Sequence, residues 1–228
     1  MKSIELVKSY VSPLFTRSYW NMVSEYVGLG RNMRGQIVSD HDSLVEFLDG
    51  RASHVSQISL YGYLRTRAGT RFPQMFENPD LLKSINIAKW HVWLACLSDL
   101  SQFTGQCLYQ SGKIDQAEIE RLIGDAVKRV LEDTGEPEEA GPDFAAARDK
   151  LLQRVAGTDW SVERDDDTLF SHSPEALFYW SPIADELKEN DETIVKNSIR
   201  FRWIEVRRNA RKLLDCDALA QVTQARES

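Results

Sequence analysis

Apolar residues recur every three or four positions along most of this chain, which is the spacing of one face of an α-helix. The clearest stretches lie at 55–64, 115–131 and 191–214, and shorter ones lie at 4–14 and 19–28. The alternation of strands and helices that indicates a parallel sheet is missing from the sequence. The pattern therefore predicts an all-α fold.

Residues 81–109 differ from the other stretches because they are apolar nearly all round, with Trp90, Trp93, Leu97 and Phe103 among them. A helix that is hydrophobic on every side is usually buried on every side. We therefore expect 81–109 to be the central helix of a single compact bundle of about seven to nine helices. The pattern leaves open whether its neighbours run parallel to it or cross it.

Capping residues and helix breakers predict where the helices begin and end. Asp115 and Glu118 form a capping box, in which each side chain accepts a bond from the other residue's backbone N–H. Asp42 is expected to cap a short helix that ends at Asp49-Gly50. Serines placed directly before prolines, at 173 and 181, predict the starts of two further short helices.

The connections between these helices are expected to be irregular. Residues 28–35 are rich in glycine and 71–80 contain two prolines, so neither segment is expected to continue a helix. Two acidic connectors are expected near 132–142 and 157–173. No linker is long enough to separate two domains, so residues 1–228 are expected to form one all-helical domain.

The composition fits a globular protein in a reducing compartment. Of the 228 residues, 42% are hydrophobic and 28% are charged, which is enough apolar material for a core at this length. Cys96, Cys107 and Cys216 are an odd number without a CxxC pair, so no disulfide framework is expected. No signal peptide and no stretch able to span a bilayer can be recognised, so we expect a cytoplasmic location.

Charge is distributed unevenly along the chain, although the net charge of −7 by itself disfavours a nucleic-acid binder. Residues 131–192 carry 18 acidic and 5 basic side chains, a net charge of −13. Residues 51–89 and 191–214 each carry a net charge of +4. This asymmetry indicates either a charged partner or pairing between segments of the same fold.

No motif for catalysis, cofactor binding or metal binding has the required spacing. The sequence contains no GxSxG nucleophile elbow, no GxGxxG and no GxxxxGK[ST] phosphate loop. His91 and Cys96 are five residues apart on one expected helix, so they point in different directions and cannot form a nucleophile–base pair. The His41-Asp42 pair has no earlier histidine to complete a helical metal site. We therefore expect no catalytic residue, no metal and no cofactor.

Two groups of arginines remain as candidates for a binding site. The seven side chains are Arg65, Arg67, Arg71, Arg200, Arg202, Arg207 and Arg211. The first three lie at an expected helix end, where cations complement the helix dipole, and the other four lie on the last long helix. Arg202 is close to the apolar face of that helix and is expected to be partly buried. Arginine offers a rigid fork of donors for carboxylates and phosphates, but either group could also be a solvated face or could pair with acidic segments of the chain.

These features favour a non-enzymatic cytoplasmic binding protein, such as an adaptor, assembly factor or regulatory subunit, that engages an acidic protein or anionic ligand through the arginines. A second hypothesis is a small helical enzyme for a phosphorylated or carboxylated substrate, in which His54, His91 or an acid transfers the proton. A third is a nucleic-acid binder, whose affinity would fall steeply with salt. A pocket that joins the arginines to a histidine would favour the enzyme, and arginines spread over a convex surface would favour the binding protein. A homo-oligomer is compatible with all three.

Overall fold

The computed structural model describes residues 36–225, and this part of the chain is all-α, as the spacing of apolar residues predicts. Its nine α-helices are α3 (His41–Ala68), α4 (Pro79–Gln110), α5 (Gln116–Thr134), α6 (Phe144–Ala156), α7 (Asp166–Leu169), α8 (His172–Trp180), α9 (Asp185–Glu189), α10 (Glu192–Leu213) and α11 (Cys216–Ala225). Two 3₁₀ helices, η2 (Gly69–Phe76) and η3 (Glu138–Ala140), lie between them. The helices predicted at 4–14 and 19–28 and the loop at 28–35 lie outside the described residues.

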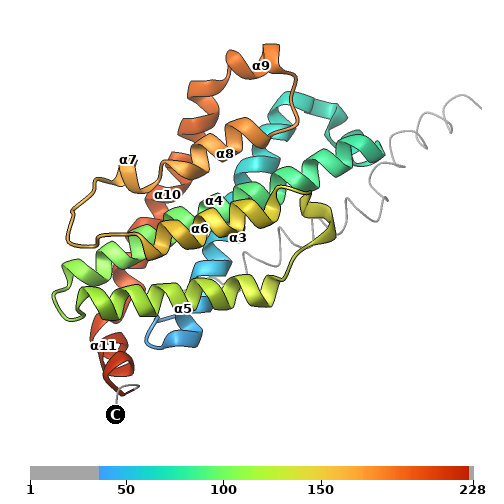
Figure 1. Cartoon of the computed structure of the whole chain (residues 1–228). Helices are drawn as coiled ribbons and strands as arrows, with labels where there is room; N and C mark the ends of the chain where they lie inside the picture. Colours follow the sequence, from blue (N-terminus) through green and yellow to red (C-terminus); the bar gives the residue numbers. More distant parts are fainter. Residues whose placement is uncertain (1–35, 226–228) are drawn as a thin grey trace, which may run out of the picture.

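Helix α4 is the centre of the bundle, as its sequence predicts. It packs against α3, α5, α6 and α8, which surround it in Figure 1. Every residue from His91 to Gln106 is buried except Ala95, so this part of the helix has no solvent face. Asn78 caps the start of α4, and Pro79 occupies the first turn, where its missing N–H removes no bond. The burial on all sides explains why the sequence of α4 lacks a polar stripe.

The surrounding helices each bury one face. Helices α5 and α6 lie side by side against α4, and α10 packs against α8 and α3 (Figure 1). The capping box at the start of α5 is confirmed, because the Glu118 N–H donates to Asp115 Oδ1 at 2.8 Å and the Asp115 N–H donates to Glu118 Oε2 at 3.1 Å. Gly135 ends this helix with a positive φ of 69°, a conformation that glycine adopts without strain.

The segment before α3 pairs with the end of α10. The Val38 N–H donates to the Leu213 carbonyl at 2.8 Å, and the Asp215 N–H donates to the Val38 carbonyl at 2.9 Å. This parallel bridge is isolated, and residues 36–225 contain no β-strand. It brings together two segments that are more than 170 positions apart and fixes where α10 ends.

The predicted break at Asp49-Gly50 is wrong, because α3 continues through it from His41 to Ala68. A glycine inside a helix costs only about 1 kcal/mol relative to alanine, which tertiary packing overrides. Here Asp49 accepts a bond from the indole of Trp93 on α4 at 3.2 Å, which holds this part of α3 against the central helix. The cap of α3 is also Asp40 rather than Asp42, since Asp40 accepts the Ser43 N–H at 2.8 Å.

The two serine-proline helix starts are misplaced. Helix α8 begins at His172, so Ser173 and Pro174 already lie in its first turn and Ser173 does not cap it. Helix α9 begins at Asp185, several residues after Ser181. The acidic connectors predicted at 132–142 and 157–173 are partly helical, because η3 lies in the first and α7 in the second.

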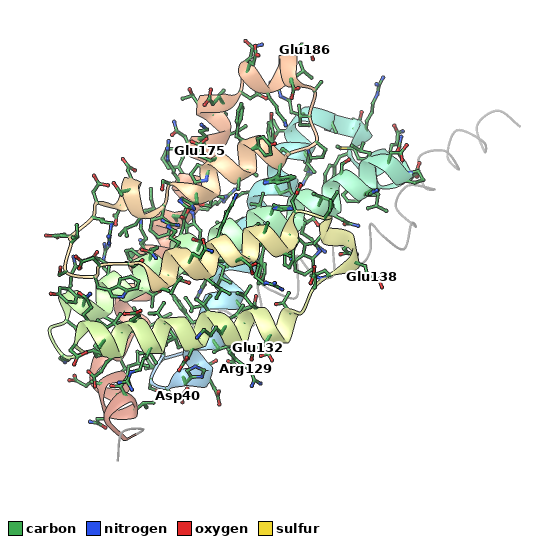
Figure 2. The ribbon with its side chains drawn as sticks, viewed as in Figure 1. Asp40, Arg129, Glu132, Glu138, Glu175 and Glu186 are labelled. Carbon is green, nitrogen blue, oxygen red and sulfur yellow. The ribbon has the colours of Figure 1, made fainter. Side chains whose placement is uncertain are left out.

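Acidic side chains project from several of these elements. Glu132 on α5, Glu138 on η3, Glu175 on α8 and Glu186 on α9 all extend into solvent in Figure 2. Among the helices of residues 36–225, none is both long enough and apolar enough to cross a membrane.

Candidate partner-binding surface

The orientation of α10 decides which of its arginines face solvent. The apolar spacing predicts an inward face of Val195, Ile199, Trp203, Val206, Ala210 and Leu213. All of these are buried except Leu213, which is half-buried. The indole N–H of Trp203 donates to Ser173 Oγ on α8 at 2.9 Å. Because this face packs against α3 and α8, the direction in which each remaining side chain of α10 points is determined.

The first arginine group is divided between an internal ion pair and solvent. Arg67 forms an ion pair with the buried carboxylate of Asp191, and the Tyr63 hydroxyl donates to the same carboxylate at 3.0 Å. Burial and the neighbouring Asp191 raise the pKa of Tyr63 to about 12. Arg67 therefore joins α3 to the start of α10. Arg65 and Arg71 are exposed and form no ion pair with another described residue.

Two arginines of the second group pair with an acidic segment of the same chain. Arg207 contacts Asp166 of α7 at 2.5 Å and Arg211 contacts the same carboxylate at 3.6 Å. Both guanidinium groups also lie over buried aromatic rings, Arg207 over Phe170 at 5.6 Å and Arg211 over Phe103 at 5.0 Å. These two arginines hold α7 against α10, and one carboxylate, that of Asp166, serves both of them.

The other two arginines of this group are placed differently. Arg200 is half-buried and donates to Asn197 Oδ1 at 3.2 Å, and its Nε is buried without a hydrogen-bond partner in the described part of the chain. Arg202 is exposed, so the expectation that it is partly buried is wrong. The reason is the rotation of α10, in which Trp203 rather than its neighbour takes the inward position.

The two arginine groups do not converge. Helices α3 and α10 run antiparallel, because Arg67 meets Asp191 whereas Arg202 lies near His54, whose pKa it helps to lower. His54 and Arg65 are eleven residues apart on α3, which separates them by about 16 Å along a helix that rises about 1.5 Å per residue. The seven arginines are therefore spread over the surface of the bundle.

A row of exposed apolar side chains on α10 is the feature that the sequence pattern did not reveal. Ile194 is 70% exposed, Phe201 is 69% exposed and Ile204 is 50% exposed. The residues at 194, 197, 201 and 204 follow alternating steps of three and four, so they lie along one face of the helix. We call this face, which comprises Ile194, Asn197, Phe201 and Ile204, the outer row. The spacing of the outer row can be read from the sequence, but the inward row on the opposite side of the helix has the same periodicity.

Unpaired cations lie along the line of the outer row and on the flank of α10 that faces α3. Arg202, Arg208 and Lys212 are exposed and form no ion pair with any residue in 36–225. Glu205 is the acidic residue on this side of α10, and it lies near Arg51 and His54 of α3. Since Lys196, Arg207 and Arg211 are already paired with Glu175, Glu192 and Asp166, the remaining positive charge of α10 is concentrated next to its exposed apolar residues.

The histidines proposed for proton transfer lie in two separate places. His54 is half-buried on α3, and burial, followed by the charges of Arg51 and Arg202, lowers its pKa. His91 is buried on α4 and stacks on Trp180, with ring centroids 3.8 Å apart, and its Nε2 has no hydrogen-bond partner within the described residues. Burial lowers the pKa of His91 as well. Only His54 lies near one of the seven arginines.

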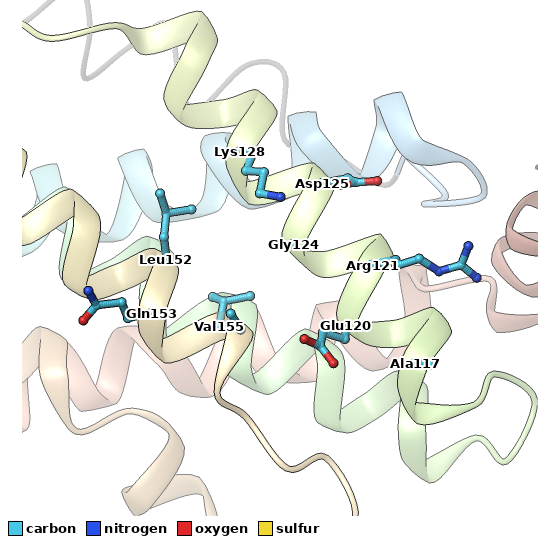
Figure 3. A pocket seen from close by; sticks show the side chains of 10 residues that line it. Ala117, Glu120, Arg121, Gly124, Asp125, Lys128, Leu152, Gln153 and Val155 are labelled. Atoms are coloured by element: carbon cyan, nitrogen blue, oxygen red, sulfur yellow. The ribbon is translucent and has the colours of Figure 1, made fainter.

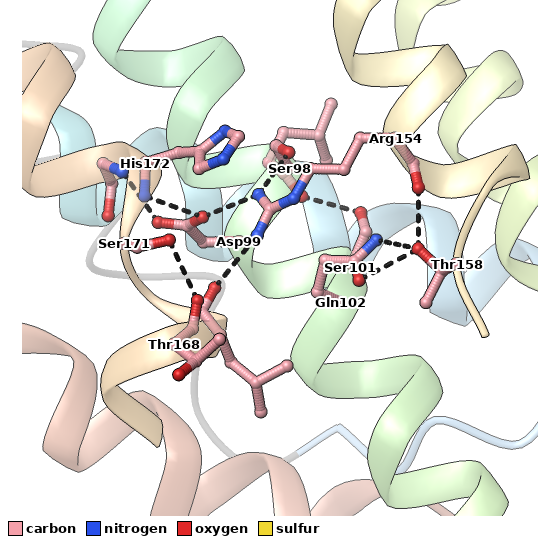
Figure 4. Close-up of polar contacts among 12 residues, drawn as sticks. Ser98, Asp99, Ser101, Gln102, Arg154, Thr158, Thr168, Ser171 and His172 are labelled. Carbon is pink, nitrogen blue, oxygen red and sulfur yellow. Dashed lines mark hydrogen bonds and ion pairs between the residues drawn. The ribbon is translucent and has the colours of Figure 1, made fainter. Parts of the chain in front are cut away.

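A buried polar network on α4 is a further feature that the sequence pattern did not predict. The fully buried carboxylate of Asp99 contacts Arg154 of α6 at 2.9 Å and accepts the backbone N–H groups of His172 and Ser173 at 3.2 and 2.7 Å (Figure 4). Burial raises the pKa of Asp99, whereas Arg154 opposes this effect. The thiol of Cys96 nearby has a pKa well above its ordinary value because it is fully buried, so it is not an activated nucleophile. The network joins α4, α6 and α8.

The described surface has a groove between α5 and α6 (Figure 3), and no residue of α10 lines it. Its volume is about 570 Å³, and its lining carries both signs of charge, with Glu120 and Asp125 beside Arg121 and Lys128. Among the described residues that line it, none is a histidine and none belongs to the seven arginines. This groove therefore does not join the arginines to a histidine, which is the arrangement that would favour an enzyme.

Neither metal chemistry nor a known relative points to another site. Within residues 36–225, no cluster of three or more histidine, cysteine or acidic side chains could hold a metal ion. Comparisons with known proteins gave no match to a family model, to a curated protein or to a solved structure.

Proposed function

We propose that this protein is a non-enzymatic cytoplasmic binding protein whose outer row on α10 engages an acidic protein partner. The observation that carries the proposal is the exposure of Phe201 and Ile194 on the helix that holds the unpaired cations. Single exposed apolar residues are common, but adjacent ones on one helix face mark interaction sites. The three unpaired cysteines favour a reducing compartment such as the cytoplasm.

The type of residues in and beside the outer row supports this proposal. Aromatic residues and arginine dominate the binding energy of protein interfaces, and Phe201 of the outer row is followed on the same helix by Arg202 and, two turns further, by Arg208. An acidic partner would meet three cations that form no ion pair within the described fold. The convex surface of a helix also suits a protein partner better than a small ligand, which requires a concave pocket.

Photo-crosslinking tests this proposal. A photoreactive phenylalanine analogue is placed at Phe201, and the protein is irradiated in a lysate of its source cells. We expect capture of a protein with an acidic surface, and we expect the capture to be lost when Arg202→Glu and Arg208→Glu are introduced together.

Two matched controls make the test specific. The same analogue at Tyr179, which is 71% exposed on α8, should capture little, and Arg65→Glu with Arg71→Glu should leave the capture at 201 unchanged. Equal capture at both positions, or loss of capture only with the Arg65 and Arg71 substitutions, would show that α10 is not the binding surface.

The enzyme hypothesis has one observation in its favour, the proximity of Arg202 to His54. An anion held by this arginine would lie near a neutral imidazole able to accept a proton. We expect hydrolysis of a general phosphate monoester, p-nitrophenyl phosphate, to be undetectable or unaffected by His54→Ala. Activity that disappears in this variant would replace the binding proposal with the enzyme.

The nucleic-acid hypothesis is tested by gel retardation. We expect no shift of DNA or RNA at low ionic strength, because the exposed surface carries the acidic side chains of α5, η3, α8 and α9 as well as the cations of α10. A shift that salt abolishes and that Arg202→Glu weakens would contradict the protein-partner proposal.

A further inference from the structure

We infer that the outer row of α10 receives a single amphipathic helix with acidic flanks from another protein. This inference rests on the proposed function and specifies the partner element that binds. It follows from the register of the outer row, from the two-sided apolar character of α10 and from the charge around it.

The outer row has the register of a helix-pairing seam. Ile194, Phe201 and Arg208 fall at one heptad position, and Asn197 and Ile204 fall at the other, so the steps alternate between three and four. Side chains at such steps insert between those of a second helix lying alongside. From 194 to 208 the seam extends for about 21 Å, since each residue adds about 1.5 Å, so it accommodates a partner helix of about four turns.

Helix α10 is apolar on two sides, and the bundle covers only one of them. Val195, Ile199 and Trp203 are buried against α3 and α8, whereas Ile194 and Phe201 are mostly exposed. A surface helix of a folded protein normally presents a polar face to water. Because the inward face already holds α10 in its helical form, a partner helix would not have to order it, which lowers the entropic cost of binding.

The charge around the outer row indicates what kind of helix binds there. Arg202, Arg208 and Lys212 form no ion pair with a described residue and outnumber Glu205, the acidic residue on this side of α10, so the complementary helix is acidic beside its apolar positions. A second copy of α10 would bring like charges together, because antiparallel pairing centred on Phe201 places Arg200 beside Arg200 of the other copy. Residues 1–35 carry five basic and two acidic side chains, so their charge is not complementary either.

A defined peptide tests the inference. The probe is a fluorescein-labelled helix of three heptads with leucine at the two seam positions and glutamate at the flanking ones. Glutamate at the flanks prevents the peptide from pairing with itself through repulsion. Fluorescence anisotropy with the full chain at low salt should show saturable binding, and the affinity should fall severalfold when the salt concentration is raised, since exposed charges are screened.

Matched variants locate the binding on α10. Phe201→Asp should weaken binding by at least about tenfold, because a central aromatic contact is replaced by a charge that repels the acidic peptide. Arg208→Glu should weaken it severalfold and reduce its dependence on salt. Tyr179→Asp, an equivalent change at an exposed aromatic residue of α8, should have no effect, and circular dichroism would verify that each variant is folded.

Several outcomes would overturn the inference. If a peptide of the same composition in scrambled order binds equally well, the attraction is due to charge alone and not to the helical seam. If a peptide with lysine at the flanking positions binds equally well, an acidic partner is not required. Sedimentation with phosphatidylserine vesicles that requires Phe201, or a dimer in analytical ultracentrifugation that Phe201→Asp dissolves, would identify a lipid surface or a second copy instead. If the peptide fails to bind while crosslinking at 201 persists, the proposed function stands and the helical partner is wrong.

Discussion

At the scale of the residue, Gly105 illustrates a position that the fold requires to be small. It lies on the buried part of α4, directly beneath the ring of Trp160, which is fully buried in the connector between α6 and α7. A Cβ at 105 would overlap three carbons of that ring. Sequence alone gives no indication of this, because a glycine within a helical pattern usually indicates only weaker helix propensity.

Gly105→Ala is therefore expected to destabilise the protein despite the higher helix propensity of alanine. Overpacking a core costs about 1–3 kcal/mol, and the indole is enclosed on its other sides and cannot move away easily. Urea unfolding followed by circular dichroism measures the change in the free energy of unfolding. Gly124→Ala is the matched control, because it lies in the middle of α5 with no atom within 4 Å of its added Cβ. It should stabilise the protein by about 0.5–1 kcal/mol, and equal effects of the two substitutions would contradict this explanation.

At the scale of the element, the start of α8 is capped by a side chain from another helix. Ser173 lies inside the first turn and does not cap the helix. The backbone N–H groups of His172 and Ser173 donate to the carboxylate of Asp99 on α4. The carboxylate is in turn paired with Arg154 of α6. A helix start is usually recognised from its own capping residue, so this one could not be placed from the local sequence.

Asp99→Ala is expected to lower the free energy of unfolding by about 3–5 kcal/mol, because it leaves Arg154 without its partner and two N–H groups of α8 without an acceptor. Chemical denaturation measures the loss, and hydrogen exchange should show reduced protection at the start of α8. Asp149→Ala removes a carboxylate from an exposed pair with Arg148 and should cost less than about 1 kcal/mol. Similar losses in the two variants would refute a special role for Asp99.

The arginines of α10 show the same dependence on other elements. The sequence places Lys196, Arg200, Arg207 and Arg211 on one stripe. Three of them, Lys196, Arg207 and Arg211, pair with acidic residues of α7 and α8, whereas Arg200 donates to Asn197. Pairing with acidic segments of the chain was one of the alternatives left open by the charge pattern. The unpaired cations Arg208 and Lys212 lie outside that stripe.

At the scale of the whole molecule, burial of histidine makes stability depend on pH. His54, which is half-buried, and His91, which is buried, both have lowered pKa values, with burial as the first cause in each case. The unfolded chain therefore takes up protons near the ordinary value of 6.5, while the folded protein resists them. The resulting stability is present above that pH and is lost as the pH falls toward the lowered pKa values.

His91→Phe is expected to flatten this acid loss. Phenylalanine keeps a ring against Trp180 but cannot take up a proton, so the free energy of unfolding should fall less steeply from pH 7 to pH 5. One proton accounts for at most about 1.4 kcal/mol per pH unit. Urea unfolding at several pH values measures the slope. An unchanged slope, or a His91 NMR titration at or above the ordinary pKa, would contradict the prediction.

The sequence by itself determined the helical fold, the central position of 81–109 and the inward face of α10, because the spacing of apolar residues is a local property that helix geometry converts directly into burial. It also placed the capping box of α5, which depends on two residues three positions apart. It failed at Gly50, where packing against α4 outweighed a weak local preference for a break.

Only the tertiary structure decided which charges meet. Arg67 and Asp191 are 124 positions apart, and their pairing depends on how α3 and α10 are packed, which no local pattern encodes. The same holds for Asp166 with Arg207, and so for the identity of the cations that remain unpaired. The sequence likewise contains both apolar rows of α10, but periodicity cannot tell which of two rows the core covers. The outer row is a candidate surface because the bundle had already buried the other one.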